Sequence, residues 1–328
     1  SGLTSQTTYK IQALVTDVAG NTSTAALTTT TNALVTVDTT APTAGTVTMT
    51  TNDPGSDGIV NTLTPSFALA VSGTSDGSYT GSGSNATGIS SVRLQVSSNG
   101  GTTWDDNATF TAPASGGTAY TVTASPALVS GTTYSVRALV TDLATNTVTS
   151  ALSTTNGRIT VDTTAPTVGT LTLDTDSGSS SSDGIVGTLT PAFTLATASD
   201  ASYTGTNAPT SAVASVVVQV STDNGSTWTT KGTSSSTSSP YAITLSGLTS
   251  QTTYKIQALV TDTAGNTSTT PLSTTNALVT VDTTAPTAGT VTMTTNDPGS
   301  DGIVNTLTPS FELAVSGTSD GSYTGSGS

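Results

Sequence analysis

The sequence predicts an all-β protein made of β-sandwich domains in a linear array. Three observations support this. Helix formers are scarce, with a single Glu and only six Lys and Arg among 328 residues. Thr and Val, which favour pleated and half-buried strands, are abundant. The sequence also repeats itself at long period, which is typical of domain arrays. A charged fraction of 8% is compatible with a disordered stalk, but the apolar residues alternate regularly, which favours folding.

The repeat defines the predicted domains. The string VDTTAPT starts at Val37, Val161 and Val281, with spacings of 124 and 120 residues. Residues 281–328 repeat 37–84 with one change, Ala68 to Glu312, and residues 1–36 closely match 246–280. Such similarity implies recent duplication and a long tandem array. We predict the C-terminal part of a B-type domain (1–37), a complete A-type domain (38–161), a complete B-type domain (162–281) and the N-terminal part of an A-type domain (282–328).

Within the complete A-type domain the pattern predicts seven strands. Val92, Leu94 and Val96 alternate with polar residues, which is the period of a half-buried strand. Short strands, frequent turn signals and this domain length fit an immunoglobulin-like β-sandwich of two sheets. The predicted strands are Gly45–Met49, Ser66–Val71, Ser90–Ser97, Trp104–Phe110, Ala119–Thr123, Thr132–Thr141 and Arg158–Val161.

The same alternation predicts the core. We expect Arg93, Gln95 and Glu312 to be exposed. Trp104 and Trp228, one in each complete domain, are interpreted as packing in the core or at a sheet edge. The residues expected to be buried are Phe67, Leu94, Val96, Tyr134, Val136, Val161, Phe193, Val218, Val220, Tyr254 and Ile256.

Composition excludes several functions. Without Cys or His, the chain has no thiol nucleophile, no Ser-His-Asp triad and no zinc-finger, haem or iron–sulfur site. A net charge of −14 argues against binding nucleic acid or an anionic membrane. No apolar run approaches the roughly 18 residues of a membrane span. Since the chain starts with Ser and shows no signal peptide, we expect it to be a segment of a longer protein.

The motifs themselves resemble a known group. The strings VTDxAGNTS and VTVDTTAP, followed by LDTDSG and SSDGIVxxLTPxF, resemble tandem bacterial immunoglobulin-like repeats of giant surface adhesins and biofilm-associated proteins, over the whole chain. The resemblance implies a non-enzymatic extracellular array at the cell surface, often with Ca²⁺ at the domain junctions.

Acidic residues concentrate at the predicted boundaries, where 13 of the 19 Asp residues fall. Carboxylates that converge without Lys or Arg repel one another unless a cation lies among them. Ca²⁺ takes six to eight such oxygen ligands. We therefore predict structural Ca²⁺ at the junctions. The candidate ligands are Asp17, Asn21, Asp38, Asn52, Asp53 and Asp57 at the first junction; Asp142, Asn146, Asp162, Asp174, Asp176 and Asp183 at the second; and Asp262, Asn266, Asp282, Asn296, Asp297 and Asp301 at the third.

At the second junction we expect the end of one domain's sixth strand (Asp142), the linker (Asp162) and the next domain's first loop (residues 174–183) to meet at one end of the sandwich. The alternative is that these acids form turns and cap strand ends, as Asp commonly does. In the repeated SD(G/A)SYTG string, Asp76, Asp200 and Asp320 are interpreted as turn residues, with a secondary metal site as the alternative.

Three functions remain open. The first is a calcium-stiffened stalk or fibre that projects or assembles at the cell surface, with identical arrays as partners; near-identical repeats suit length and stiffness. The second is an adhesive module that binds a host, a glycan or a neighbouring cell. The third is an accessory module of a secreted polysaccharide-degrading enzyme. Catalysis by carboxylate pairs is not expected, because the acids recur once per domain without aromatic sugar platforms.

Overall fold

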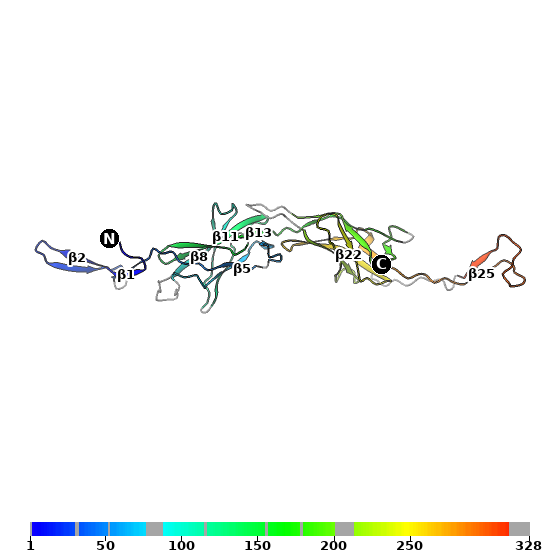
Figure 1. Ribbon diagram of the computed structural model, residues 1–328, viewed down its shortest axis with the longest axis horizontal. Helices are drawn as coiled ribbons and strands as arrows, with labels where there is room; N and C mark the ends of the chain where they lie inside the picture. Colours follow the sequence, from blue (N-terminus) through cyan, green and yellow to red (C-terminus); the bar gives the residue numbers. More distant parts are fainter. Residues whose placement is uncertain are drawn as a thin grey trace. The chain divides into compact units, whose positions relative to one another are not determined.

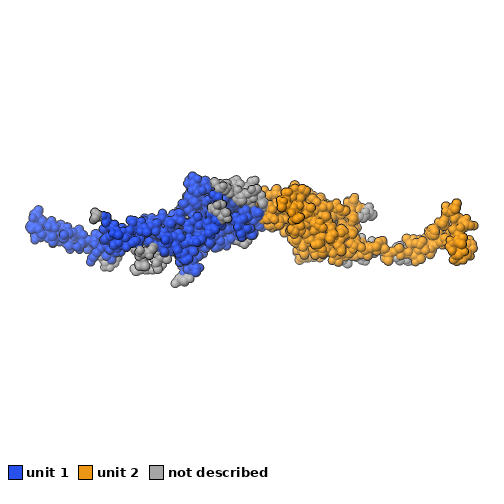
Figure 2. All heavy atoms as spheres, viewed as in Figure 1, with its two compact units in different colours: residues 1–164, 201–211, 263–266 blue, residues 165–200, 212–262, 267–328 orange. Residues whose placement is uncertain are grey.

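The computed structural model describes residues 2–29, 33–51, 53–76, 88–114, 117–154, 157–177, 180–200 and 213–314. Across these ranges the regular structure is β-strand with short 3₁₀ turns such as η3 (Thr275–Ala277), and no helix among these residues is able to cross a membrane. The chain divides into two compact units (Figure 2), whose sequence boundary follows Thr164, with the turn Thr263–Asn266 grouped with the first.

The first unit contains a complete sandwich of two sheets. One sheet has the order β10-β7-β5 and the other β6-β13-β11-β8-β9, with β12 also paired to β11. Figure 1 shows β8 and β11, whose eight paired positions form the central ladder of the larger sheet. The strands are β5 (Val47–Met49), β6 (Ile59–Val60), β7 (Ser66–Ala70), β8 (Ile89–Ser97), β9 (Asp105–Thr109), β10 (Ala119–Thr123), β11 (Thr132–Asp142), β12 (Thr147–Ala151) and β13 (Arg158–Val161).

The second unit repeats this topology. Its sheets have the orders β15-β17-β21 and β16-β24-β22-β19-β20, with β23 paired to β22 and a separate β14–β18 pair. The strands are β14 (Thr167–Val168), β15 (Leu171–Leu173), β16 (Ile185–Val186), β17 (Ala192–Leu195), β18 (Ala198–Ser199), β19 (Val213–Ser221), β20 (Thr229–Thr233), β21 (Tyr241–Thr244), β22 (Thr252–Asp262), β23 (Thr267–Pro271) and β24 (Leu278–Val281). The fold class is thus tandem immunoglobulin-like β-sandwiches, as predicted.

The strands at the two ends of the chain pair in the same way as strands of the complete sandwiches. β1 (Thr7–Lys10) pairs with β4 (Leu34–Val37), and β2 (Gln12–Thr16) pairs with β3 (Thr22–Ala26). These pairings match those of β22 with β24 and β23. At the other end, β25 (Val291–Met293) pairs with β26 (Phe311–Leu313), as β5 does with β7.

The predicted strands and core are confirmed. All seven predicted strands of the first sandwich are present, and the short strands β6 and β12 are additional. Each of the eleven side chains predicted to be buried is at most 8% exposed. They belong to two separate apolar clusters, one in each sandwich, so the period-2 register predicted from the sequence is correct.

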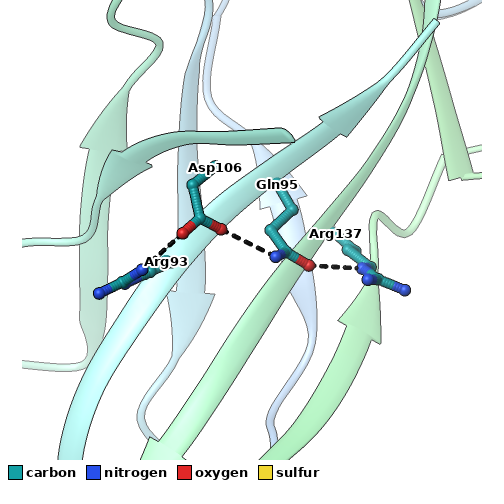
Figure 3. Close-up of polar contacts among 4 residues, drawn as sticks. All are labelled: Arg93, Gln95, Asp106 and Arg137. Carbon is teal, nitrogen blue, oxygen red and sulfur yellow. Dashed lines mark hydrogen bonds and ion pairs between the residues drawn. The ribbon is translucent and has the colours of Figure 1, made fainter. Parts of the chain in front are cut away.

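The prediction for Gln95 is wrong, because it is 9% exposed while Arg93 and Glu312 are exposed. Figure 3 shows the reason: Gln95 lies between Asp106 of β9 and Arg137 of β11 on the face opposite the core. Its Nε2 donates to Asp106 Oδ1 (2.8 Å), and Arg137 Nε donates to its Oε1 (2.8 Å). Arg137 also lies 3.9 Å above the ring of the half-buried Trp104, so this tryptophan packs on the sheet surface.

The repeated SDGIV string forms the crossing to the edge strand. β6 runs parallel to β13, and Thr160 N–H donates to Gly58 O (2.8 Å). Gly58 has φ +85°, and a Cβ atom there would lie 3.1 Å from Arg158 O. Glycine is favoured here because the backbone is left-handed and a Cβ atom would lie in tight contact with the neighbouring strand. Gly184 repeats the arrangement with φ +76°.

Candidate metal centre

The strand register separates residues that the sequence analysis grouped. Val161 of β13 pairs with Thr132 at the start of β11, whereas Asp142 lies at the end of β11 opposite Ile89. The ten steps from Thr132 to Asp142, at about 3.3 Å each, span roughly 33 Å. Asp162 follows Val161, so it lies at the opposite end of this sheet from Asp142. The predicted grouping of Asp142 with Asp162 is therefore wrong, because an antiparallel neighbour ends where its partner begins.

The acids of the first loop bind backbone instead. Gly58 N–H donates to Asp53 Oδ2 (2.8 Å), and Ile59 N–H donates to Asp57 Oδ1 (3.0 Å). Asp176 with Asp183, and Asp297 with Asp301, repeat both contacts. Asp174 and Asn296 are exposed, and Asn52 lies outside the described residues. No described member of this set belongs to a group of three clustered carboxylates, so their visible role is to shape the turn before β6 and its equivalents.

The VTDxAxN string forms a hairpin turn closed by its own side chains. Asn146 N–H donates to Asp142 Oδ1 (2.8 Å) and its Nδ2 donates to Asp142 Oδ2 (2.9 Å). Asp17 and Asn21 make the same two contacts in the exposed β2–β3 hairpin, where the Asn21 hydrogen bonds lower the pKa of Asp17. In these two copies the motif therefore has a structural role in closing the turn.

Three carboxylates from distant segments meet in the first unit. Oxygens of Asp38, Asp76 and Asp142 all lie within 4.8 Å of one another. Asp38 follows β4, and Asp142 ends β11. A β-bridge between Thr43 and Ser75 brings the Asp76 loop beside the segment that follows Asp38. Asp38 of the VDTTAPT string and Asp76 thus meet the VTDxAxN turn at one end of the sandwich.

The environment of this triad is unfavourable for bare carboxylates. Asp142 is 0% exposed and Asp76 is 4% exposed. Asp142 accepts three hydrogen bonds from the backbone and side chain of its turn, but both oxygens of Asp76 are buried and accept none. No ion pair among the described residues includes any of the three. Burial, with the charges of Asp38 and Asp142, raises the pKa of Asp76.

The donor set fits a hard cation. All side-chain donors are oxygen, and the chain has no His or Cys, so calcium or magnesium suits the site better than zinc or copper. The two free oxygens of Asp76, with one each from Asp38 and Asp142, would give four protein ligands, and water would complete the six to eight that Ca²⁺ takes. From the sequence alone, Asp76 is interpreted first as a turn residue. The sequence did contain a signal for a metal-binding role, because Asp76 and the linker residue Asp38 both recur once per domain.

The other two junctions repeat parts of this arrangement. In the second unit, carboxylate oxygens of Asp200 and Asp262 lie within 4.8 Å of each other, and Asp262 is 2% exposed. The buried linker residue Asp162 is the sequence counterpart of Asp38. Its carbonyl oxygen accepts Asn266 Nδ2 (3.0 Å), just as Asp38 O accepts Asn146 Nδ2 (3.3 Å). At the third junction Asp282 Oδ1 accepts Thr284 N–H, and Asp320 lies outside the described residues.

Comparison with known proteins finds only distant similarity to solved structures. No protein-family model and no curated protein matches the chain. Solved structures that it resembles include domains FN1–FN3 of chicken CNTN1 (14% identity over 77% of this chain and 72% of that one, TM-score 0.26). Domains A168–A170 of titin match at 11% identity, over 84% and 75% of the two chains, with a TM-score of 0.34. The mixed-linkage glucan utilization locus protein SGBP-B of Bacteroides ovatus, solved with a heptasaccharide, matches at 16%, over 88% and 56%, with a TM-score of 0.21.

Proposed function

We propose that this chain is a non-enzymatic structural segment of a large extracellular bacterial surface protein, in which calcium stiffens a stalk or fibre of immunoglobulin-like domains. The observation that carries the proposal is the pair of buried, unpartnered oxygens of Asp76 beside two further carboxylates. Buried polar groups in proteins are almost always paired, so an unpaired ionisable group needs a partner that the protein itself does not supply.

A divalent cation satisfies this requirement. Calcium supplies positive charge that cancels the mutual repulsion of the three carboxylates. The chain's own residues prepare the site: Asn146 and two backbone N–H groups hold Asp142, and the Thr43–Ser75 bridge holds the Asp76 loop. The buried position of Asp142 and Asp76 limits access of water to the carboxylates.

The location of the site supports a mechanical role. Asp38 belongs to the segment that leads from β4 into the first sandwich, whereas Asp76 and Asp142 belong to the sandwich itself. A cation held by all three would fix that segment to the domain. Pro42 restricts its own φ and biases Ala41 toward extended backbone, so little slack remains in the segment.

The repetition supports a structural role over an adhesive one. Residues 281–328 repeat 37–84 with one substitution, and Glu312, the changed residue, is exposed on β26. Copies that keep the core and the junction acids unchanged suit uniform length and stiffness. An array that binds calcium outside the cell, where calcium is plentiful, would stay flexible during export and become stiff afterwards.

The test is a comparison of the whole chain with calcium and with chelator. We expect calcium to raise the melting temperature and the maximum dimension from small-angle scattering. Stabilisation should follow RT ln(1 + [L]/Kd), about 2.7 kcal/mol at a hundredfold excess over Kd. Identical melting and scattering in both buffers would overturn the proposal and leave the acids as turn residues.

A further inference from the structure

The turn that precedes β1, β11 and β22 occurs in three copies. In each copy a tyrosine hydroxyl accepts the backbone N–H five residues earlier: Tyr9 from Thr4, Tyr134 from Val129 and Tyr254 from Thr249. In each copy a serine Oγ also accepts a backbone N–H of the following linker. These pairs are Ser5 with Thr39, Ser130 with Thr163 and Ser250 with Thr283. The three turns are therefore a matched set.

One position in the turn differs between the domain types. B-type copies carry Gln6 and Gln251, whereas the A-type copy carries Gly131. All three residues adopt left-handed backbone, with φ of +58°, +60° and +74°. Glycine takes this conformation at no steric cost, whereas an L-residue such as Gln is disfavoured there. Glycine would thus be the better residue for the turn alone, and the B-type copies keep Gln against that preference.

The side chain of Gln explains its presence. Gln6 Nε2 donates to Asp38 Oδ1 at 2.6 Å, and Gln251 Nε2 donates to Asp282 Oδ1. Asp38 Oδ1 also accepts Thr40 N–H (2.9 Å). Both bonds use the same oxygen, so Oδ2 is the one left for a cation. At the remaining junction, Gly131 has no side chain with which to orient Asp162.

We propose that Gln6 and Gln251 are positioning residues that orient the linker carboxylate for cation binding and so couple each B-type domain to the metal site of the A-type domain that follows. This inference rests on the proposed function. If the glutamines have this role, two kinds of domain junction alternate along the array. At B-to-A junctions a glutamine of the preceding domain helps to organise the ligand. At the A-to-B junction the equivalent residue is glycine, which has no side chain to do so. Residues that orient a metal ligand typically change metal affinity by 10–100-fold when removed.

The experiment is a double-mutant cycle on the whole chain between Gln6→Gly and Asp76→Asn, with calcium affinity measured by titration calorimetry. Gln6→Gly should weaken calcium binding at the first site roughly tenfold. It should not lower thermal stability in chelator, because glycine removes the left-handed strain. In the Asp76→Asn background, where the first site has lost a ligand, Gln6→Gly should have no effect on the remaining calcium binding.

A matched control separates strain from positioning. Asn224 also has left-handed backbone, with φ +60°, but it lies in the β19–β20 hairpin and contacts Lys255. Asn224→Gly should leave calcium affinity at the first site unchanged. If Gln6→Gly also leaves calcium affinity unchanged while Asp76→Asn weakens it, the positioning role is wrong and the proposed function stands. If Asp76→Asn has no effect on calcium binding, the proposed function itself fails.

Discussion

Replacing Asp76 by Asn should change stability in opposite directions with and without calcium. The substitution keeps the size of the side chain and removes its charge from a group of three carboxylates. Without metal, it removes repulsion that the folded protein otherwise tolerates. With calcium, it removes the ligand with two free buried oxygens.

The geometry sets the size of the effect. At the 4.8 Å limit of the cluster and an effective dielectric constant of about 20, each carboxylate pair repels by about 3.5 kcal/mol. Asp38 is partly exposed, so solvent screens its share. We expect metal-free Asp76→Asn to be more stable than the parent by about 1–3 kcal/mol. At a hundredfold excess of calcium over Kd the parent gains about 2.7 kcal/mol, and the variant should lose most of that gain.

The assay is urea unfolding followed by tryptophan fluorescence in a Trp228→Phe background. The chain has two tryptophans, and Trp104 then reports the first sandwich alone. Asp57→Asn is the control, because Asp57 accepts Ile59 N–H in a turn and lies outside the triad. That control should be slightly destabilised by the same amount in calcium and in chelator. If Asp76→Asn is destabilised equally in both buffers, the carboxylate stabilises the fold in some other way and the reasoning is refuted.

Three further outcomes follow from the fold. Phe67→Ala should cost about 3–5 kcal/mol of unfolding free energy, because the ring is fully buried; a loss below 1 kcal/mol in urea unfolding would contradict the assigned core. Gly58→Ala should destabilise the chain by at least about 1 kcal/mol more than Gly20→Ala. Both have left-handed φ, but only at Gly58 does backbone obstruct the new Cβ; equal melting temperatures would show that the β6 crossing is not tight. Hydrogen bonds from Gln95 and from an arginine on the same strand lower the pKa of Asp106. The stability it contributes is therefore present above the unfolded pKa of about 3.9 and is lost as pH falls through the lower folded value. Since Asp106 is largely exposed, Asp106→Asn should remove under about 1 kcal/mol of this pH-dependent stability. If the parent and the variant show the same change in melting temperature between pH 2 and 5, the contact does not contribute and the prediction is wrong.

The sequence alone determined the fold class and the buried faces. Strand side chains alternate with period two, so Leu94 and Val96, or Tyr134 and Val136, reveal the core face without knowledge of any partner strand. The repeat likewise predicted that the second sandwich would copy the first. The alternation did not predict the burial of Gln95, because that burial comes from side chains on two neighbouring strands.

The tertiary structure decided which acids meet. From the sequence, Asp38 and Asp142 are candidate ligands in different groups, and Asp76 is interpreted as a turn residue with a secondary metal site as the alternative. Their convergence depends on the pairing of β11 with β8 and β13 and on the Thr43–Ser75 bridge. Such contacts join segments tens of residues apart, and local periodicity carries no information about them. The role of Gln6 needed the same information, because only a backbone angle and an interatomic distance distinguish a positioning residue from one more polar residue in a turn.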